Sequence, residues 1–411
     1  MKSESLFRNL IVAVSAVVAM PLLVIAQQGL TEKGLRKSAV HFPHYAVTDL
    51  GVLGAGTNAS AFDMNNVGWV AGSSNLTAGG PQHAFVWYGH GGLKDLGTLD
   101  GAACPMCNSG ADGPNLFGQT AIGSEISQAD PDGEDFCAYG THLQCRGVVS
   151  RNGKLFALQN LPGGRNANAF GINDLGQLVG FAENGVRDST CAATTPFQIF
   201  QFEAVRWEPN GEIRELQPLT KKGDTVAFAM GINDFGQAVG SSGTCATQGL
   251  PPLNVTGLHA VLWERNGTPT YLGTLGDAAH TASNNASSIN NLGQVVGTSE
   301  FTDGTIHSFL WTKATGMQGL ESLPGAFATI AGCCRTINDH GDVVGFAFDD
   351  AGMHAVVWIN KKISDLNALI PSDSPLYLLG AYSINDAGEI VGQACVLPEC
   401  TELHAFLATP K

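Results

Sequence analysis

Residues 286–325 decide the fold, and they read ASSINNLGQVVGTSEFTDGTIHSFLWTKATGMQGLESLPG. The stretch contains four short segments, ASSIN, QVVGTS, HSFLW and MQGLESL, with turn-forming residues between them. Apolar residues do not recur every three to four positions here, so the pattern predicts strands and not helices. We therefore expect one unit of four β-strands.

The turn between the first two segments recurs along the chain. In each copy an Asn is followed three residues later by a Gly and then by a short strand. The seven Asn residues are Asn65, Asn115, Asn173, Asn233, Asn290, Asn338 and Asn385. Successive copies are 47 to 60 residues apart, and repeats of about this length are typical of solenoids and propellers. Asn and Asp favour a turn and Gly accepts the left-handed position, so each copy predicts a tight hairpin, which we call the Asn turn.

The third segment of most repeats carries a second motif, His-Ala-Phe or a relative. Five histidines begin it, His83, His259, His307, His354 and His404, whereas residues 146–149 and 203–207 depart from it. Over residues 45–411 this combination resembles the extracellular HAF-repeat family. The resemblance implies an exported repeat protein with a propeller-like fold. No activity belongs to the family as such, so no catalytic residue is carried over.

The two ends of the repeat region are offset. Residues 45–53, YAVTDLGVL, match the last strand of a repeat before any first strand has occurred. Residues 402–407, ELHAFL, match a third strand, and the sequence ends before a fourth. We therefore predict an all-β fold: a seven-bladed β-propeller of four-stranded blades, in which the N-terminal strand completes the last blade.

The N-terminus is typical of an exported protein. Lys2 and Arg8 precede an apolar run over residues 10–26, and a small residue, Ala26, ends it. This pattern predicts a signal peptide over residues 1–26, cleaved after Ala26, and a secreted or extracytoplasmic protein. The alternative is an uncleaved membrane anchor, because the run approaches the length of a spanning helix. Residues 27–44 then form a polar tether, and residues 45–411 form the single propeller domain.

The charge limits the partners. The formal net charge is −15, with few charged residues of either sign, which argues against nucleic acid and against a membrane surface beyond the signal segment. We expect a monomer with an extracellular glycan or protein as partner. No cofactor and no metal are predicted, because one His per blade places the histidines far apart around a ring. Each is expected to bond a turn or a neighbouring Asp instead.

Strand alternation separates the two faces of the ring. If the Asn turns lie on one face, which we call the turn face, the other connections lie on the opposite loop face. These connections are long at residues 124–145, 181–202 and 241–258, and loops on a rigid scaffold commonly carry function. Within the first, residues 130–135 are acidic, but they lack the spacing of a calcium loop, so we favour a solvated loop.

Ten cysteines in an exported chain predict disulfides. Cys137 with Cys145 and Cys395 with Cys400 each lie within one loop, and Cys191 with Cys245 join neighbouring loops. Cys104 and Cys107 form a C-x-x-C, and Cys333 and Cys334 are adjacent. A redox pair or a zinc site is the alternative for these last four, but they enter opposite sides of the ring and no helix follows Cys104. We favour structural disulfides and leave their connectivity open.

Two classes of function remain. The first is a non-catalytic binding or scaffold propeller whose loop face holds a carbohydrate or protein. Its candidate contacts are the aromatic residues Phe136, Tyr139, Phe197, Phe200 and Phe202, which alternatively cover the loops' own small cores. The second is a propeller hydrolase or lyase acting on a glycan or ester, which needs convergent ionisable groups at the axis.

The inner strands offer only scattered candidates for catalysis, Asp63, Asp112 and Arg335, so no catalytic residue is assigned. Three or more ionisable groups gathered at the axis would favour the enzyme. A purely structural surface-layer component is a third interpretation. Binding is preferred because the sequence shows no catalytic site.

Overall fold

The computed structural model describes residues 40–188, 198–245, 258–276, 284–302, 305–332 and 334–411. The signal segment, the cleavage after Ala26 and the tether up to residue 39 lie outside the described residues. Within them the regular structure is β-strand, together with the short 3-10 helices η1 (Gly101–Ala103), η2 (Thr220–Lys222) and η4 (Leu366–Leu369). No helix in this part of the chain is both long and apolar enough to cross a membrane. The predicted all-β class is confirmed.

The first three sheets contain four antiparallel strands each. One consists of β2 (Ala59–Met64), β3 (Val70–Asn75), β4 (Gln82–Trp87) and β5 (Lys94–Gly97). The next consists of β6 (Ser109–Pro114), β7 (Thr120–Ala129), β8 (Leu143–Arg151) and β9 (Lys154–Ala157). The third consists of β10 (Ala167–Ile172), β11 (Leu178–Arg187), β12 (Phe200–Trp207) and β13 (Ile213–Leu216).

The following strands continue this pattern. A four-stranded sheet contains β14 (Val226–Ile232), β15 (Ala238–Gly243), β16 (His259–Trp263) and β17 (Pro269–Tyr271). The group β18 (Asn284–Ile289), β19 (Val295–Glu300), β20 (Ile306–Thr312) and β21 (Gly316–Gly319) precedes the group β22 (Ala328–Ala331), β23 (Val343–Asp349), β24 (Gly352–Ile359) and β25 (Lys362–Asp365). One parallel pair, His307 with Thr329, joins these two groups into an eight-stranded sheet.

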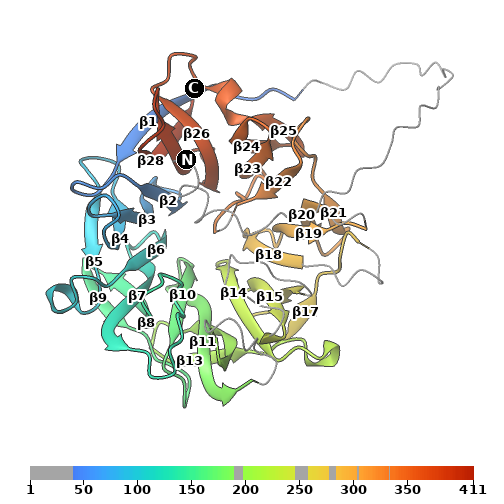
Figure 1. Cartoon of the computed structure of the whole chain (residues 1–411). Helices are drawn as coiled ribbons and strands as arrows, with labels where there is room; N and C mark the ends of the chain where they lie inside the picture. Colours follow the sequence, from blue (N-terminus) through green and yellow to red (C-terminus); the bar gives the residue numbers. More distant parts are fainter. Residues whose placement is uncertain (1–39, 189–197, 246–257, 277–283, 303–304, 333) are drawn as a thin grey trace.

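The last sheet combines the two ends of the described chain. It contains β26 (Leu376–Ile384), β27 (Ile390–Val396), β28 (Leu403–Pro410) and, beside β28, β1 (Tyr45–Gly51). Tyr45 pairs with Pro410, so the beginning of β1 lies beside the end of β28. Figure 1 shows the sheets arranged around a central axis, with the first strand of each group innermost, as in a β-propeller.

Close packing between the first and second strands requires glycine. In β15, a Cβ at Gly240 would lie 2.0 Å from the Phe228 carbonyl oxygen, and at Gly297 of β19 the distance to the Asn285 oxygen would be 1.9 Å. In β14 a register shift lies beside this contact, between Ala229 and Gly231. Only a residue without a side chain fits, which explains why the repeat keeps Gly at this position.

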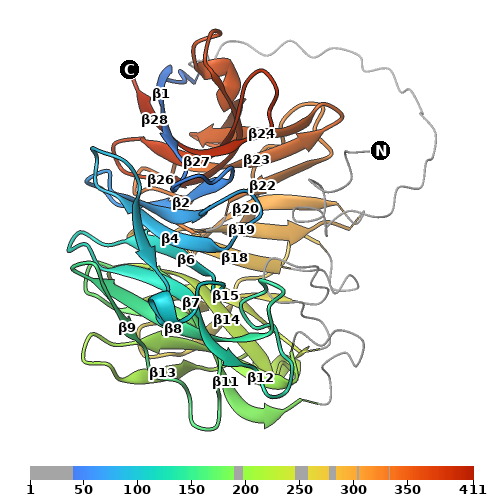
Figure 2. The same cartoon turned by 60° about the vertical axis from the view of Figure 1, so that its left-hand side comes forward.

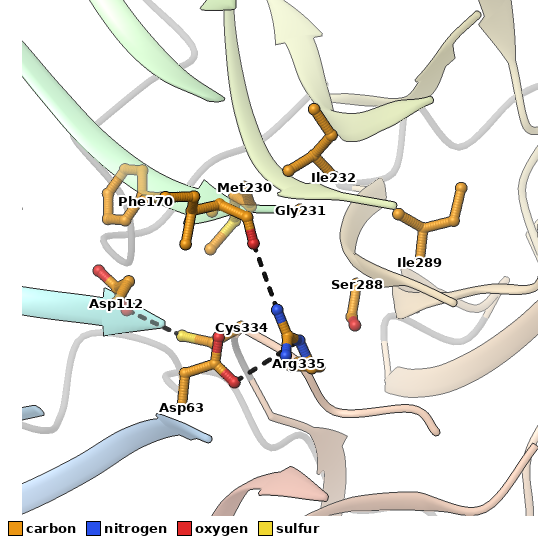
Figure 3. A pocket seen from close by; sticks show the side chains of 12 residues that line it. Asp63, Asp112, Phe170, Met230, Gly231, Ile232, Ser288, Ile289, Cys334 and Arg335 are labelled. Atoms are coloured by element: carbon orange, nitrogen blue, oxygen red, sulfur yellow. Dashed lines mark hydrogen bonds and ion pairs between the residues drawn. The ribbon is translucent and has the colours of Figure 1, made fainter. Parts of the chain in front are cut away.

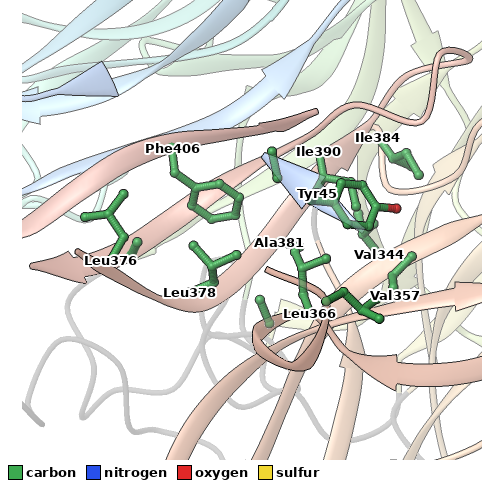
Figure 4. Packing of buried hydrophobic residues seen from close by; sticks show 14 residues of the cluster. Tyr45, Val344, Val357, Leu366, Leu376, Leu378, Ala381, Ile384, Ile390 and Phe406 are labelled. Atoms are coloured by element: carbon green, nitrogen blue, oxygen red, sulfur yellow. The ribbon is translucent and has the colours of Figure 1, made fainter. Parts of the chain in front are cut away.

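The core lies between neighbouring sheets. In Figure 4, Tyr45 of β1 and Phe406 of β28 pack with Val344 and Val357 of the preceding sheet, and all four are buried. Tryptophans of the third strands add polar contacts between sheets. The buried Trp207 and Trp263 each donate an indole N–H, at 2.8 Å, to a backbone oxygen just after the last strand of the preceding sheet. Each sheet therefore needs its neighbour for both apolar burial and hydrogen bonding.

The Asn turns also connect the sheets, which the sequence did not reveal. Asn233 Oδ1 accepts the backbone N–H groups of Phe235 (3.1 Å) and Gln237 (3.0 Å), closing its own turn. Its Nδ2 donates to the Asn290 carbonyl oxygen of the next turn at 3.1 Å. Equivalent bonds run from Asn65 to Asn115, Asn115 to Asn173, Asn173 to Asn233, Asn290 to Asn338, Asn338 to Asn385 and Asn385 to Asn65.

Candidate functional site

A small pocket lies on the axis, at the ends of the innermost strands. The residues three positions before the turn Asn are equivalent in the seven repeats. They are Phe62, Asp112, Phe170, Met230, Ser287, Arg335 and Tyr382. Four members of this series, Asp112, Phe170, Met230 and Arg335, line the pocket. Asp112 and Arg335 are the only charged members, so the repeat pattern is broken at these positions by one anion and one cation.

Asp63 lies one residue further along, where the other repeats have Gly, Ser or Thr. Its side chain is buried and accepts the Ser383 hydroxyl at 2.8 Å and the Met64 N–H at 2.6 Å. A Cβ at Gly113 would lie 2.8 Å from Asp63 Oδ2, so glycine in the next sheet makes room for this carboxylate. Burial raises the pKa of Asp63, against the opposing effect of Arg335.

Arg335 reaches across the axis. It donates to the Met64 carbonyl oxygen and to the Ile172 carbonyl oxygen, each at 3.2 Å, and its Nε lies 3.9 Å from Asp63 Oδ1. Figure 3 shows the guanidinium between Asp63 and the strand that carries Phe170. Arg335 therefore links its own segment, between β22 and β23, to two other sheets.

Asp112 occupies the adjacent side of the pocket. Cys334 Sγ donates to Asp112 Oδ1 at 3.1 Å, and burial raises the pKa of Asp112 to about 7, with a further contribution from the Asp63 charge. A carboxyl group with such a pKa exchanges protons near neutrality, as a general acid or base must. The pocket thus gathers Asp63, Asp112 and Arg335, which the sequence presented as scattered.

The size of the pocket limits its chemistry. Its cavity volume is about 30 Å³, which is enough for water or for one functional group of a ligand. Sites that enclose a small molecule typically have volumes of about 300–1,000 Å³. Two donors of Arg335 are also engaged with backbone oxygens. The arrangement suits a bridging role within the ring better than the enclosure of a sugar.

A second candidate lies on the loop face, where two neighbouring sheets have long middle strands. β7 and β11 each contain 10 residues, whereas β3 and β19 contain 6. We call the ends of these two hairpins, residues 125–145 and 183–188 with 198–203, together with residues 165–166 just before β10, the platform. β7, β8, β11 and β12 are labelled in Figure 2.

Ionic and polar contacts join the two halves of the platform. Asp132 of the first hairpin pairs with Arg187 Nη2 of β11 at 2.6 Å and with Arg165 Nη1, just before β10, at 2.7 Å. Asp130 accepts the Asn166 amide N–H at 3.0 Å. Because the two hairpins share these bonds, they form one unit and not two independent loops.

A buried carboxyl pair lies beneath these contacts. Glu134 is 1% exposed, and its Oε1 accepts the backbone N–H groups of Ile199 and Phe200 from the second hairpin. Burial and the neighbouring Glu183 raise the pKa of Glu134 to about 9, so it is protonated at neutral pH. Glu183 accepts the Asn166 backbone N–H at 3.0 Å. In the described residues, no group of three or more His, Cys, Asp or Glu is arranged to hold a metal ion.

The predicted aromatic contacts occupy different environments. Phe136 and Phe202 are buried with Phe181, and the ring centroids lie 4.8 and 5.6 Å from that of Phe181. These two residues therefore cover the core of the loops. Tyr139 and Phe200 are half-buried. The Phe200 ring lies 5.0 Å from the guanidinium of Arg187, and Phe197 lies outside the described residues.

Most described cysteines form disulfides. The pairs are Cys104–Cys107, Cys137–Cys145 and Cys395–Cys400, and Cys245 is also disulfide-bonded. Cys191 and Cys333 lie outside the described residues. Cys334 corrects the prediction: it acts as a thiol donor to Asp112, because the segment between β22 and β23 brings it to the axial pocket.

The repeated histidines bond nearby groups, as Nδ1 of His259 does with Asp224 at 2.9 Å and Nδ1 of His404 with Asp49 at 2.9 Å. His83 and His354 likewise contact Asp95 and Asp349. His307 contacts the Thr305 hydroxyl. The contacts of Asp132 with Arg165 and Arg187 could not be predicted from the sequence, because single charges in irregular loops carry no period.

Several solved structures resemble this chain in fold. No protein-family model matches the sequence, and no curated protein sequence matches it. The β-propeller domain of the Trilobed protease from Pyrococcus furiosus is 11% identical, with 87% of this chain and 94% of that chain covered and a TM-score of 0.49. An acylaminoacyl peptidase from Pyrococcus horikoshii is 10% identical, with a TM-score of 0.48. A lectin from Aleuria aurantia is 9% identical, with 78% and 97% covered and a TM-score of 0.38.

The peptidase likeness is partial. It covers 84% of this chain, and the chain spans about half, 50%, of the peptidase. At these identities the likenesses concern the fold alone.

Proposed function

We propose that this protein is an exported propeller of the HAF-repeat type that binds a glycan or protein partner through the platform. The observation that carries the proposal is the pair of salt bridges by which Asp132 holds Arg165 and Arg187 across two sheets. The Arg187 side chain is 64% exposed, and its guanidinium lies over the ring of the half-buried Phe200. Aromatic faces pack against sugar rings, and guanidinium groups bind carboxylates and hydroxyls.

The proposal includes the seven-bladed ring closed by β1. The chain of Asn side-chain bonds supports it, because it returns from Asn385 to Asn65. The pairing of β1 with β28 supports it as well. Export is supported by the disulfides, which persist in oxidising compartments.

The experiment is a glycan and peptide array probed with residues 27–411 produced under oxidising conditions. We expect specific binding that Cys137→Ser with Cys145→Ser abolishes. The matched control is Cys395→Ser with Cys400→Ser, which removes a disulfide from a loop of another sheet and leaves binding unchanged. Equal loss with both double variants, or binding indifferent to Arg187→Ala, would reject the platform as the site.

A propeller hydrolase or lyase acting on a glycan or ester is the second candidate, because three ionisable groups do gather at the axis. In that case Asp112 is the group to exchange a proton and Asp63 the second carboxylate. The test is turnover of glycan and ester libraries by the parent and by Asp112→Asn. Activity that Asp112→Asn removes while binding on the array persists would favour the enzyme. Turnover by neither protein would leave the axial groups with a structural role.

A further inference from the structure

The turn face carries a ring of exposed apolar side chains. At the residue two positions after the turn Asn, Val67, Phe117, Leu175, Phe235 and Leu292 are 56–75% exposed. Because each occupies the same position of an equivalent turn, all five point away from the same face of the propeller. Apolar groups spread singly over a surface are ordinary, but a regular ring on one face forms a surface for contact.

Carboxylates lie just inside this ring. The residue that follows the turn Asn is Asp174, Asp234, Asp339 or Asp386 in four of the repeats, and each of these is partly exposed. Each accepts a backbone N–H of the preceding turn, at 2.8 to 2.9 Å, so the carboxylates are fixed in place around the axis. Arg265 belongs to the hairpin of β16 and β17, and its Cγ lies 3.3 Å from a Cβ placed at Gly236 of the Asn233 turn. The centre of the face is acidic and its turn tips are apolar.

The chain enters the described structure at this same face. Tyr45 begins β1 opposite Pro410, and Pro410 Cγ lies 3.7 Å from a Cβ placed at Gly388, in the Asn turn of that sheet. The backbone N–H of Lys411 also donates to the His44 carbonyl oxygen at 2.8 Å. Residues 40–44 therefore leave the sheet beside the turn face, and the preceding part of the chain starts from its edge.

The preceding residues have the complementary chemistry. Residues 27–39, QQGLTEKGLRKSA, contain Lys33, Arg36 and Lys37 against a single acidic residue, Glu32, and they include Leu30 and Leu35. An extended segment of this length reaches about 45 Å. A four-stranded sheet at a strand spacing of about 4.8 Å measures about 15–20 Å from its outer strand to the axis. The segment is long enough to reach the centre of the face.

We propose that residues 27–39 dock on the turn face of their own propeller. Lys33, Arg36 and Lys37 contact the inner aspartates, and Leu30 and Leu35 cover turn tips such as Phe117 and Phe235. A second copy of the turn face is a poor partner, because two acidic centres would repel one another. An anionic membrane surface is disfavoured for the same reason. The proposal does not depend on the platform, which lies on the opposite face.

The first test is zero-length carbodiimide cross-linking of the exported protein, which joins an amine to a carboxylate only in direct contact. We expect intramolecular links from Lys33 or Lys37 to Asp174, Asp234, Asp339 or Asp386, lost at high salt. Links to other carboxylates only, or links between molecules only, would overturn the proposal. The latter result would indicate contact between copies.

The second test measures the contact in trans. A chain of residues 40–411, which keeps every described residue, is titrated with a synthetic peptide of residues 27–39. We expect Phe117→Ser with Phe235→Ser to weaken binding by about tenfold, equivalent to about 1.4 kcal/mol. The matched control is Met106→Ser with Phe327→Ser, which removes two apolar side chains that lie in connections between sheets and are 67% and 56% exposed. This control should leave peptide binding unchanged.

Absence of peptide binding, or equal loss with both double variants, would overturn the docking. Flotation of the 40–411 chain with phosphatidylcholine vesicles, lost in Phe117→Ser with Phe235→Ser, would assign the turn face to a membrane instead. A failed array experiment with successful cross-linking would reject the platform alone, so the two proposals are tested separately.

Discussion

Replacing Asn233 by Asp separates the two roles of the turn Asn. Asp keeps the Oδ1 acceptor that closes the local turn through Phe235 and Gln237. It removes the two N–H donors that bind the Asn290 carbonyl oxygen at 3.1 Å and Gln237 Oε1 at 2.9 Å. The substitution therefore removes the bond between sheets and one side-chain bond within the turn, and it keeps the two backbone N–H bonds that close the hairpin.

The expected magnitude follows from these contacts. Loss of two neutral hydrogen bonds costs about 1 kcal/mol each. Asn233 is 3% exposed, so the substitution also buries a carboxylate facing a carbonyl oxygen, and an unpaired polar group adds about 1–3 kcal/mol. We expect the free energy of unfolding to fall by about 3–5 kcal/mol. Asn233→Ala, which also removes the local acceptor, should cost at least as much.

Urea unfolding followed by tryptophan fluorescence measures the effect. Asn210 is the matched control, because its Oδ1 closes an exposed turn by accepting the Glu212 N–H at 3.1 Å and makes no contact with another sheet in the hydrogen bonds described. Asn210→Asp should change stability by less than about 0.5 kcal/mol. If Asn233→Asp is as mild as Asn210→Asp while Asn233→Ala is severe, the turn Asn acts only locally and the reasoning fails.

Three further outcomes are expected. Burial and Glu183 raise the pKa of Glu134 to about 9, so the folded state keeps a proton that the unfolded chain loses above its ordinary pKa. The stability of the fold should therefore fall as pH rises from about 4.5 to 9. In thermal melts, Glu134→Gln should flatten this dependence of stability on pH between about pH 7 and 9. Gly240→Ala should destabilise the protein by about 2–4 kcal/mol or prevent folding, because its Cβ would lie 2.0 Å from a backbone oxygen. The control is Gly92→Ala, whose Cβ would have no neighbour within 4 Å, and it should shift the midpoint of urea unfolding little. Arg335→Met should lower the free energy of unfolding by about 2–3 kcal/mol, because it removes the hydrogen bonds to the Met64 and Ile172 carbonyl oxygens. An unchanged midpoint of urea unfolding would contradict the bridging role of Arg335.

Local chemistry made much of the fold predictable. The Asn turns fixed the hairpin positions, and alternation in segments such as residues 307–311 identified the strands. Burial of Phe136 and Phe202 was left open because an aromatic residue in a loop can face either way. Cys334 is predicted to form a disulfide because ten cysteines in an exported chain favour disulfides, and the sequence does not show that this residue lies at the axis.

The sequence by itself determined the repeat, the all-β class and the position of each turn, because these depend on periodicity and on the backbone preferences of Asn and Gly. Only the tertiary structure decided which distant residues meet. Asp112 and Arg335 occupy the same position of two repeats, and Asp63 lies one position further along in a third. They converge because the innermost strands all end beside one axis. Asp132 meets Arg165 and Arg187 for a related reason: two neighbouring sheets extend their hairpins side by side, and contacts between sheets leave no periodic trace in the chain.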